Sequence, residues 1–301
     1  MTHIVVLGST NMDLVAYVDK APARGETVTG REFRTIPGGK GANQAIAAAR
    51  AGAGAGAGVT MIGAVGNDVY GPQLRAALEH SGVDTDLLRT IDTPSGTAHI
   101  VVDDEGGNAI VVIPGANGTV DHLAPGDEAL IASADVLLLQ LEIPLAAVVA
   151  GARAARAHGV RTILTPAPAQ PLPPELLAAV DLLVPNEHEA TTLTGLADPI
   201  AAATALLDSV PAAVVTLGPA GCLYVSRGAE PLAVPAPEVA AVDSTGAGDT
   251  FVGALAVALA EERPIREALK WAAAAAALSV QRPGASASMP YRSEIETEYA
   301  S

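Results

Sequence analysis

The stretch "DVLLLQLEIPLAAVVAGARAARAHGVRTILTP", residues 135–166, decides the fold class of this chain. It begins with a short apolar run at 135–140, continues with helical spacing over 144–159, and returns to an apolar run at 161–166. Strands that are apolar on both faces and are joined by a helix are typical of neighbours in a parallel sheet covered on two sides.

The same alternation continues along most of the chain. Further strands are predicted at 3–8, 59–66, 181–186 and 212–218, and further helices at 41–51, 71–82 and 188–195. The last third, 250–281, is strongly helical, and Pro264 stands where a second helix would begin. The sequence therefore predicts an α/β fold with a mostly parallel sheet between two helical layers.

Two segments depart from this alternation. Residues 14–36 and 97–113 alternate between apolar and polar positions, and the second segment contains a hairpin around "DEGGN" at 104–108. Neither segment has helices of its own, so we expect a small antiparallel accessory sheet. Such a sheet indicates a lid over a site, a dimerisation surface, or both.

Composition narrows the class of protein. The 301 residues are half hydrophobic and carry a formal net charge of -16, which disfavours nucleic acid and anionic membranes as partners. No apolar run is long enough to span a membrane and the chain starts directly with a strand, so we expect a cytoplasmic protein. The single cysteine, Cys222, excludes a disulfide framework and is expected to be a buried structural thiol.

The motif "PGGKGANQA", residues 37–45, combines Gly39 with Lys40 and Asn43 at the start of a predicted helix. Glycines permit close backbone approach, and the two polar side chains then surround a concave backbone. This arrangement suits a polyhydroxylated ligand, although a helix-capping loop is equally compatible. The motif lacks the ending of a phosphate-binding Walker loop.

Polar residues also follow two predicted strands. Asn11 and Asp13 come just after the first strand, where Asp13 could accept hydrogen bonds from a vicinal diol. An ordinary Asx turn is the alternative. Glu142 follows the strand at 135–140 among leucines, so it either has a hydrogen-bonding partner or belongs to a surface loop.

Two further turns could contact a nucleotide or a metal. In "PNEHEA", residues 185–190, Asn186 and Glu189 could hold Mg²⁺ largely through water, or they could cap a helix. In "TLGPAG", residues 216–221, Thr216, Gly218 and Gly221 could expose backbone N–H groups to phosphate or ribose. A plain hairpin turn is the alternative.

The motif "DSTGAGDTF", residues 243–251, is the one most suggestive of catalysis. If a helix starts at 247, the N–H groups of Gly246, Ala247 and Gly248 converge at its positive end and form an anion hole. Asp249 then lies within reach of a hydroxyl that approaches a bound phosphate. An aspartate is an adequate base here because phosphoryl transfer has a loose transition state. A capped helix start is the alternative.

Other chemistries fit less well. The "AGAGAGAG" stretch at 51–58 contains a nominal dinucleotide fingerprint, but it follows a helix and precedes a strand, which is the wrong context for a dehydrogenase. The six histidines lack zinc-site spacing, and no G-x-S-x-G elbow occurs.

Taken together and in order, these motifs resemble the ribokinase family of sugar kinases over essentially the whole chain. "GGKGAN" at 38–43 and "TGAGDTF" at 245–251 are the two specific signatures. The resemblance implies a single domain over 1–301, built as a three-layer αβα sandwich with a small β lid. It also implies ATP as phosphoryl donor, Mg²⁺, K⁺ as an activating cation, transfer to O5 of D-ribose, and a homodimer formed through the lid.

The resemblance implies a role for each matching residue. The sugar hydroxyls would be held by Asn11, Asp13, Gly39, Lys40, Asn43 and Glu142, with Asp249 as the base. The anion hole would consist of Gly246, Ala247 and Gly248. The nucleotide would contact Asn186, Thr216, Gly218, Gly221 and Gly248, with Glu189 near Mg²⁺ and its waters. The monovalent cation would be bound by Asp243, Thr245, Ser279, Arg282, Gly284 and Ser288, mostly through backbone carbonyls.

The sequence departs from the family pattern at two places: the connection at 51–58 is longer than usual, and Pro283 stands within the cation loop. Two alternatives remain open. One is a sibling kinase for 2-deoxyribose, a nucleoside or another sugar, since Asp13 and the lid would set that choice. The other is a non-catalytic sugar-binding protein on the same fold, which would be expected to have lost the base Asp249.

Overall fold

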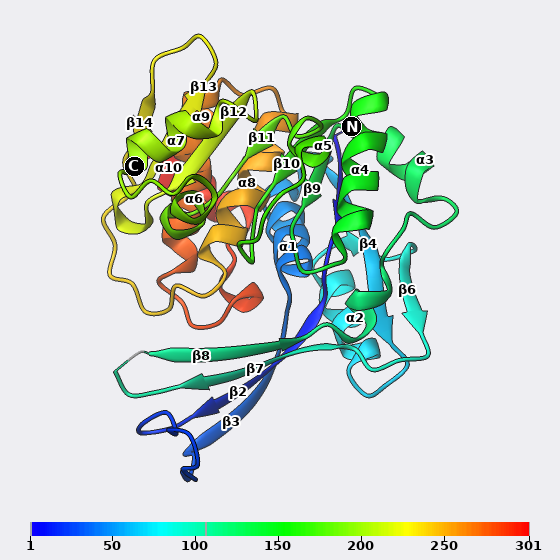
Figure 1. Ribbon diagram of the computed structural model, residues 1–301, viewed down its shortest axis with the longest axis vertical. Helices are drawn as coiled ribbons and strands as arrows, with labels where there is room; N and C mark the ends of the chain where they lie inside the picture. Colours follow the sequence, from blue (N-terminus) through cyan, green and yellow to red (C-terminus); the bar gives the residue numbers. More distant parts are fainter. Residues whose placement is uncertain (1, 106, 301) are drawn as a thin grey trace.

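The computed structural model describes residues 2–105 and 107–300, and a large twisted sheet forms its centre (Figure 1). The strand order is β14-β13-β12-β11-β10-β9-β1-β4-β5, and β6 also pairs with β4. All neighbouring pairs are parallel except those that β13 makes with β12 and β14. The strands are β1 (His3–Leu7), β4 (Gly58–Gly66), β5 (Val83–Asp84), β6 (Leu88–Ile91), β9 (Val136–Leu139), β10 (Arg161–Leu164), β11 (Leu182–Leu183), β12 (Ala212–Thr216), β13 (Cys222–Ser226) and β14 (Leu232–Val234).

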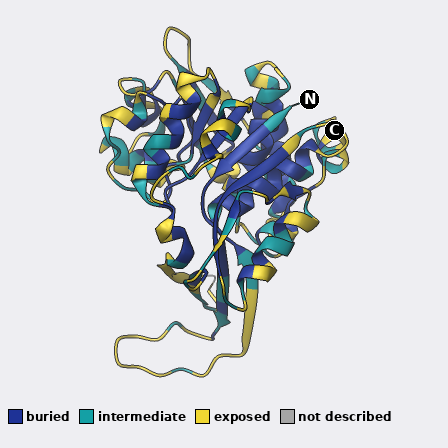
Figure 2. Cartoon of the chain, turned by 90° about the vertical axis from the view of Figure 1, so that its right-hand side faces the viewer, coloured by how far each residue is buried: buried dark blue, intermediate teal, exposed yellow. Residues whose placement is uncertain are grey.

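Helices cover both faces of this sheet. One face packs against α1 (Lys40–Gly52), α2 (Gly71–His80), α8 (Ala247–Ala260), α9 (Ile265–Ser279) and α10 (Arg292–Tyr299). The other packs against α3 (Asp127–Ala132), α4 (Leu145–Ala157), α5 (Pro174–Leu177), α6 (Glu187–Thr194) and α7 (Pro199–Leu206). The predicted three-layer α/β architecture is confirmed, and Figure 2 shows the buried sheet between partly exposed helices.

The two faces of the sheet explain why its strands are apolar throughout. In β1, Ile4 and Val6 enter one hydrophobic core, while Val5 and Leu7 enter the other. All four side chains are fully buried. On β13, Cys222 is buried as expected for a structural thiol, and burial raises its pKa to about 12.

A second sheet of four strands extends away from the main body (Figure 1). Its order is β3-β2-β7-β8, made by β2 (Asn11–Tyr17), β3 (Glu32–Gly38), β7 (Gly96–Val102) and β8 (Asn108–Ile113). The two outer pairs are antiparallel, but β2 and β7 are parallel, which differs from the fully antiparallel sheet expected. Both strands leave the main body in the same direction, so they run alongside each other. Gly106, within the predicted turn at 104–108, lies outside the described residues, as do the end residues Met1 and Ser301 of the predicted domain.

Close packing of α1 against α8 brings two motifs together. A Cβ atom on Gly253 of α8 would lie only 2.6 Å from the Cβ of Ala47 and 2.8 Å from the carbonyl oxygen of Gln44, both on α1. The two helix backbones therefore touch at Gly253. This contact places the first turn of α8 beside the first turn of α1. No helix among the residues described has the length and hydrophobicity needed to cross a membrane.

Candidate active site

Asp249 lies in the first turn of α8 and is buried. Its two carboxylate oxygens are each bound by an amide from α1. Asn43 Nδ2 donates to Oδ2 at 3.1 Å, and Gln44 Nε2 donates to Oδ1 at 3.1 Å. The structure thus joins the "GGKGAN" and "TGAGDTF" motifs directly. Gln44 was not among the predicted site residues.

The glycines at the start of α1 allow two junctions of the chain to pack together. Gly39 has a φ of 92°, and a Cβ there would lie 2.7 Å from the backbone N of Asn11. A Cβ on Gly41 would lie 2.5 Å from the backbone N of Ser9. The junction of β3 with α1 therefore lies directly against the junction of β1 with β2, which brings Lys40 and Asn43 to the carboxyl end of β1.

Glu142 caps the start of α1. Its Oε2 accepts hydrogen bonds from the hydroxyl of Ser9 at 2.5 Å and from the backbone N–H of Lys40 at 3.0 Å. Glu142 is therefore a partnered, partly buried residue and does not belong to a free surface loop. Its position just after β9 holds its charge next to Lys40.

Asn11 and Asp13 lie within β2 itself, so the Asx-turn interpretation is wrong for this segment. Asn11 accepts a hydrogen bond from Asn117 Nδ2 at 2.8 Å, a residue that the sequence analysis did not identify. The carboxylate of Asp13 leans across the strand pair, where a Cβ on Gly38 would lie 2.4 Å from its Oδ2. The small sheet thus contributes two polar side chains to the edge of the main sheet.

Burial and neighbouring charges strongly perturb this cluster. The pKa of Asp13 is raised to about 7, first by burial and then by the charges of Glu142 and Asp249. Burial acts to lower the pKa of Lys40, but nearby carboxylates raise it overall, so Lys40 stays a cation. These carboxylates belong to Asp249, Glu142, Glu189 and Asp13. An excess of hydrogen-bond acceptors over cations suits a ligand rich in O–H donors.

The pKa of Asp249 is also raised. Burial is the main cause, and the charge of Lys40 and the two amide donors offset it in part. A carboxylate with a raised pKa is a better base near neutral pH than an ordinary aspartate. Asp249 therefore has the environment of a general base.

A groove of about 390 Å³ adjoins the first turn of α8. It is lined by Thr216, Gly218, Gly221, Ala247 and Gly248 of the predicted set. Phe251, Ala273, Ala277 and Val280 make part of its wall apolar. The groove can therefore hold a flat apolar ring at one part and a polar group at the helix end.

The helix start agrees only partly with the predicted anion hole. The Ala247 N–H donates to the Ser244 carbonyl at 3.2 Å, so this amide already has an acceptor. Within 2–105 and 107–300, the amides of Gly246 and Gly248 have none. A Cβ on Gly248 would meet nothing within 4 Å, whereas one on Gly246 would press on Ala285 at 3.2 Å. Packing within the chain therefore does not require a glycine at 248.

Asn186 and Glu189 form a capping box at the start of α6. Asn186 Oδ1 accepts from the Glu189 N–H at 2.8 Å, and Glu189 Oε2 accepts from the Asn186 N–H at 2.9 Å. The helix-cap interpretation is therefore correct. Asn186 also forms a bridge to Thr216, next to the groove, and the pKa of Glu189 is raised, mainly by burial.

The predicted cation residues come from the loop before α8 and from the segment that begins at the end of α9, and the structure joins these two segments. Asp243 Oδ1 accepts from the Thr245 N–H at 2.9 Å, and its Oδ2 accepts from the Gly284 N–H at 2.8 Å. These bonds outweigh burial and lower the pKa of Asp243. The hydroxyls of Ser279 and Ser288 bond to nearby backbone carbonyls instead. The guanidinium of Arg282 forms an ion pair with Glu294, which is outside this set. In the part of the chain that the structure describes, no group of three or more His, Cys, Asp or Glu residues could hold a metal.

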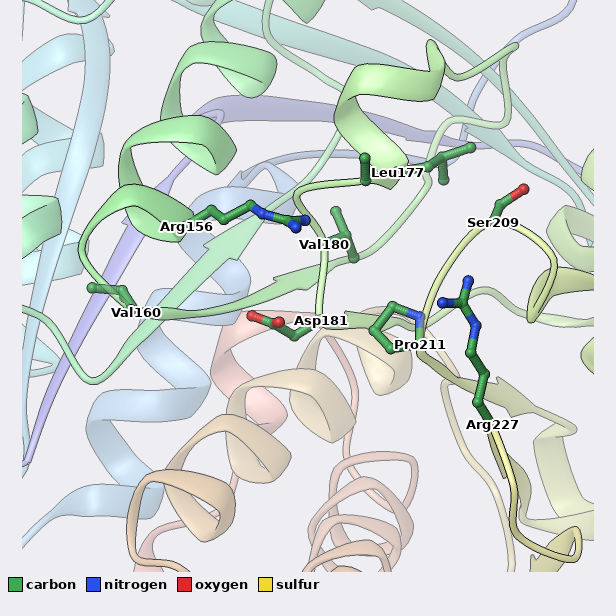
Figure 3. A pocket seen from close by; sticks show the side chains of 10 residues that line it. Arg156, Val160, Leu177, Val180, Asp181, Ser209, Pro211 and Arg227 are labelled. Atoms are coloured by element: carbon green, nitrogen blue, oxygen red, sulfur yellow. The ribbon is translucent and has the colours of Figure 1, made fainter.

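Another cavity, of about 600 Å³, lies at the opposite ends of the strands, where α4 ends and β10 and β12 begin (Figure 3). Arg156 and Arg227 approach it from different elements, and both are exposed. It contains none of the predicted site residues. The candidate active site is therefore the cluster around Asp249 with its adjoining groove.

A buried carboxylate beside the open N-terminus of a helix, at the carboxyl edge of a parallel sheet, is the arrangement expected of a phosphoryl-transfer enzyme that acts on an alcohol, as a sugar kinase does. A family model described as pfkB family carbohydrate kinase matches residues 1–292, and the chain belongs to this family. The predicted family resemblance is thereby confirmed.

Individual relatives agree with this assignment. The ribokinase of Bacillus subtilis is 46% identical over 302 residues, covering 98% of this chain and 99% of that protein. The ribokinase of Schizosaccharomyces pombe is 41% identical over 316 residues, covering 99% and 98%. The structure of Arabidopsis thaliana ribokinase complexed with ribose and ATP is similar, with a TM-score of 0.92, 34% identity and coverage of 99% of both chains.

Proposed function

We propose that this protein transfers the γ-phosphoryl group of ATP to O5 of D-ribose and so forms D-ribose 5-phosphate. The observation that carries the proposal is Asp249, a buried carboxylate with a raised pKa that lies beside the amides of Gly246 and Gly248, which have no acceptor among the described residues. The names of the full-length relatives, and the ribose and ATP of the Arabidopsis complex, favour this sugar and this donor.

In this proposal, the sugar lies between the small sheet and the main sheet. Asn11 and Asp13 reach it from β2, Gly39, Lys40 and Asn43 reach it from the start of α1, and Glu142 reaches it from the end of β9. Asp249 receives the proton of the attacking hydroxyl, and its amide partners hold it in place. The positive end of α8 stabilises the charge on the transferred group.

The nucleotide would occupy the groove of about 390 Å³. Thr216, Gly218 and Gly221 would lie along it, with Asn186 beside Thr216. Its apolar wall around Phe251 and Val280 suits the purine ring. The end of the groove at Gly248 would then receive the phosphates.

Two cations fit the oxygen donors that are present. Mg²⁺ prefers oxygen ligands and keeps several waters, so the carboxylate of Glu189 would hold the ion through water. When bound, Mg²⁺ would neutralise phosphate charge. K⁺ would be bound by carbonyl oxygens of the two segments that the Asp243–Gly284 hydrogen bond joins. Asp243 and Thr245 lie in the first of these segments; Ser279, at the end of α9, and Arg282, Gly284 and Ser288 belong to the second. The K⁺ ion would stabilise the shape of the 246–248 turn.

The segments 14–36 and 97–113 would form the lid of a single domain and the surface of a homodimer. Every residue of β8 is exposed, including Ile110, Val111, Val112 and Ile113. A monomer seldom leaves such a contiguous apolar strand uncovered, and a second copy of the same strand would cover it.

An assay of ADP release with a panel of sugars tests this function. Ribose should be turned over with higher kcat/KM than 2-deoxyribose; the reverse would favour the sibling-kinase alternative. Asp249→Asn should leave ribose binding nearly intact and lower kcat by about 10²-fold or more. Near-normal turnover in that variant, or ribose binding without turnover in the unmodified protein, would contradict the proposal.

A further inference from the structure

Gln44 is fully buried in α1, and both N–H groups and the carbonyl oxygen of its amide are hydrogen-bonded. Its Nε2 donates to Asp249 Oδ1 at 3.1 Å and to the hydroxyl of Thr165 at 3.1 Å. Its Oε1 accepts from Gln140 Nε2 at 2.7 Å. Because each position has a different partner, the amide can adopt only one orientation.

The partners of Gln44 come from the carboxyl ends of adjacent strands. Gln140 directly follows β9, and Thr165 directly follows β10. Gly8, directly after β1, leaves the space for Gln140, since a Cβ there would lie 2.1 Å from Gln140 Oε1. Among the residues described, Gln140 Oε1 has no donor, which costs stability in a buried site. A network that costs stability and ends on the candidate base points to a functional role.

We propose that Gln44, braced by Gln140 and Thr165, is a positioning residue that fixes the orientation of the Asp249 carboxylate. The inference rests on the proposed function, in which Asp249 receives the proton of the sugar hydroxyl. Gln44 has no exposed surface, so it acts through Asp249 and does not touch the substrate. Asn43 and Gln44 each donate to one carboxylate oxygen, so one lone pair of each oxygen is occupied and another is left to accept a proton from the sugar hydroxyl.

The same contact also favours the charged form of the carboxylate. Other charged groups face Asp249 from α1, β2, α6 and the end of β9: Lys40, Asp13, Glu189 and Glu142. The three acids and burial favour the protonated form of Asp249, and Lys40 and the amide donors favour the charged form. Loss of Gln44 therefore removes a donor that lowers the pKa of Asp249, and the acidic limb of the kcat profile should move to higher pH.

The test compares variants of the network. Gln44→Met removes the amide at similar length and should lower kcat by about ten- to hundred-fold, while KM for the sugar changes little. Gln140→Met and Thr165→Val remove only the braces and should give smaller decreases in the same direction. Thr162→Val is the matched control, because Thr162 is fully buried on β10 and its hydroxyl has no partner within the described chain. It should leave kcat and its pH profile unchanged.

Two results would overturn the inference. One is a Gln44→Met enzyme with the kcat and acidic limb of the unmodified protein; the other is a raised KM with unchanged kcat, which indicates contact with the sugar. If Gln44→Met does not fold, the test rests on Gln140→Met and Thr165→Val. The positioning role would be rejected if both variants had the same kcat, and the same acidic limb of the kcat profile, as the unmodified protein.

The inference can fail separately from the proposed function. If the unmodified protein phosphorylates no sugar, the function is wrong, but the Asp249 carboxyl can still be titrated by ¹³C NMR, with its signal assigned through Asp249→Asn. Gln44→Met should raise the midpoint of that titration. An unchanged midpoint would reject the contact as a positioning interaction.

Discussion

Gly248→Ala should make the protein more stable and less active. Gly248 is the second residue of α8, and an added Cβ would point into open space at the end of the groove. A helical glycine costs about 1 kcal/mol relative to alanine, so the substitution should stabilise the fold by up to that amount. With an unfolding entropy of about 2.1 cal/mol/K per residue, this corresponds to a rise in Tm of about 1–2 °C for a 301-residue chain.

The same methyl group would occupy the space proposed for the phosphoryl group. Displacing an anion from one backbone donor costs about 10²-fold in kcat in comparable oxyanion sites, and we expect a loss of this size. Calorimetry gives the change in Tm, and the ADP-release assay gives kcat at saturating sugar and ATP. The two readouts should move in opposite directions.

Gly253→Ala is the matched control on the same helix. Its Cβ would lie 2.6 Å from the Cβ of Ala47, so overpacking should cost about 1–3 kcal/mol and lower Tm. If Gly248→Ala lowers Tm as well, the space beside Gly248 is not open. If Gly248→Ala keeps the kcat of the unmodified protein, the phosphoryl group does not bind at this helix end.

Three further predictions concern charge, cation and assembly. The pKa of Asp13 in the folded state is raised to about 7 from 3.8, so this residue should lower the stability of the fold increasingly as pH rises between about 4 and 7. Asp13→Asn should therefore raise Tm more at pH 8 than at pH 5. An equal rise in Tm at both pH values would contradict the pKa shift. In K⁺, turnover should be several-fold higher than in Na⁺ or in a bulky organic cation, and Tm should be measurably higher. Identical turnover and Tm in all three salts would exclude a K⁺ site. Val111→Lys on β8 should convert a dimer to a monomer in analytical ultracentrifugation; a monomeric unmodified protein, or a dimeric variant, would reject the lid interface.

The sequence predicted the main sheet well because its strands are buried on both faces. Runs such as 135–140 and 161–166 can only satisfy their apolar side chains between two helical layers, and they became β9 and β10. The helix α7 was missed although Asp198 and Pro199 provide a clear start signal, since the Asp198 side chain caps the Ala201 N–H. The parallel pairing of β2 with β7 could not be predicted, because alternation gives the face of a residue and not the direction of its neighbour.

The candidate site was predictable where its residues follow strands directly. Glu142 comes shortly after β9, and Asn11 and Asp13 come in β2 shortly after β1 ends; topology alone brings such residues to one edge of a sheet. Gln44 gave no such signal, because its proposed role depends on its hydrogen bond with Gln140, which follows a strand far away in the sequence. The only hint was the polar Gln140 at the end of the leucine run at 137–139.

The glycines of the two signature motifs have different physical causes, and only the structure separates them. Gly39 and Gly41 are needed because neighbouring backbone atoms lie within 3 Å of where a Cβ would stand. Gly248 has no such neighbour, yet it occupies a helical position where glycine is costly. Since packing among the described residues gives no reason for that glycine, we propose that the reason lies in a group that the helix end binds. This is why the absence of a side chain at Gly248 supports an anion site more strongly than the glycine-rich composition of either motif.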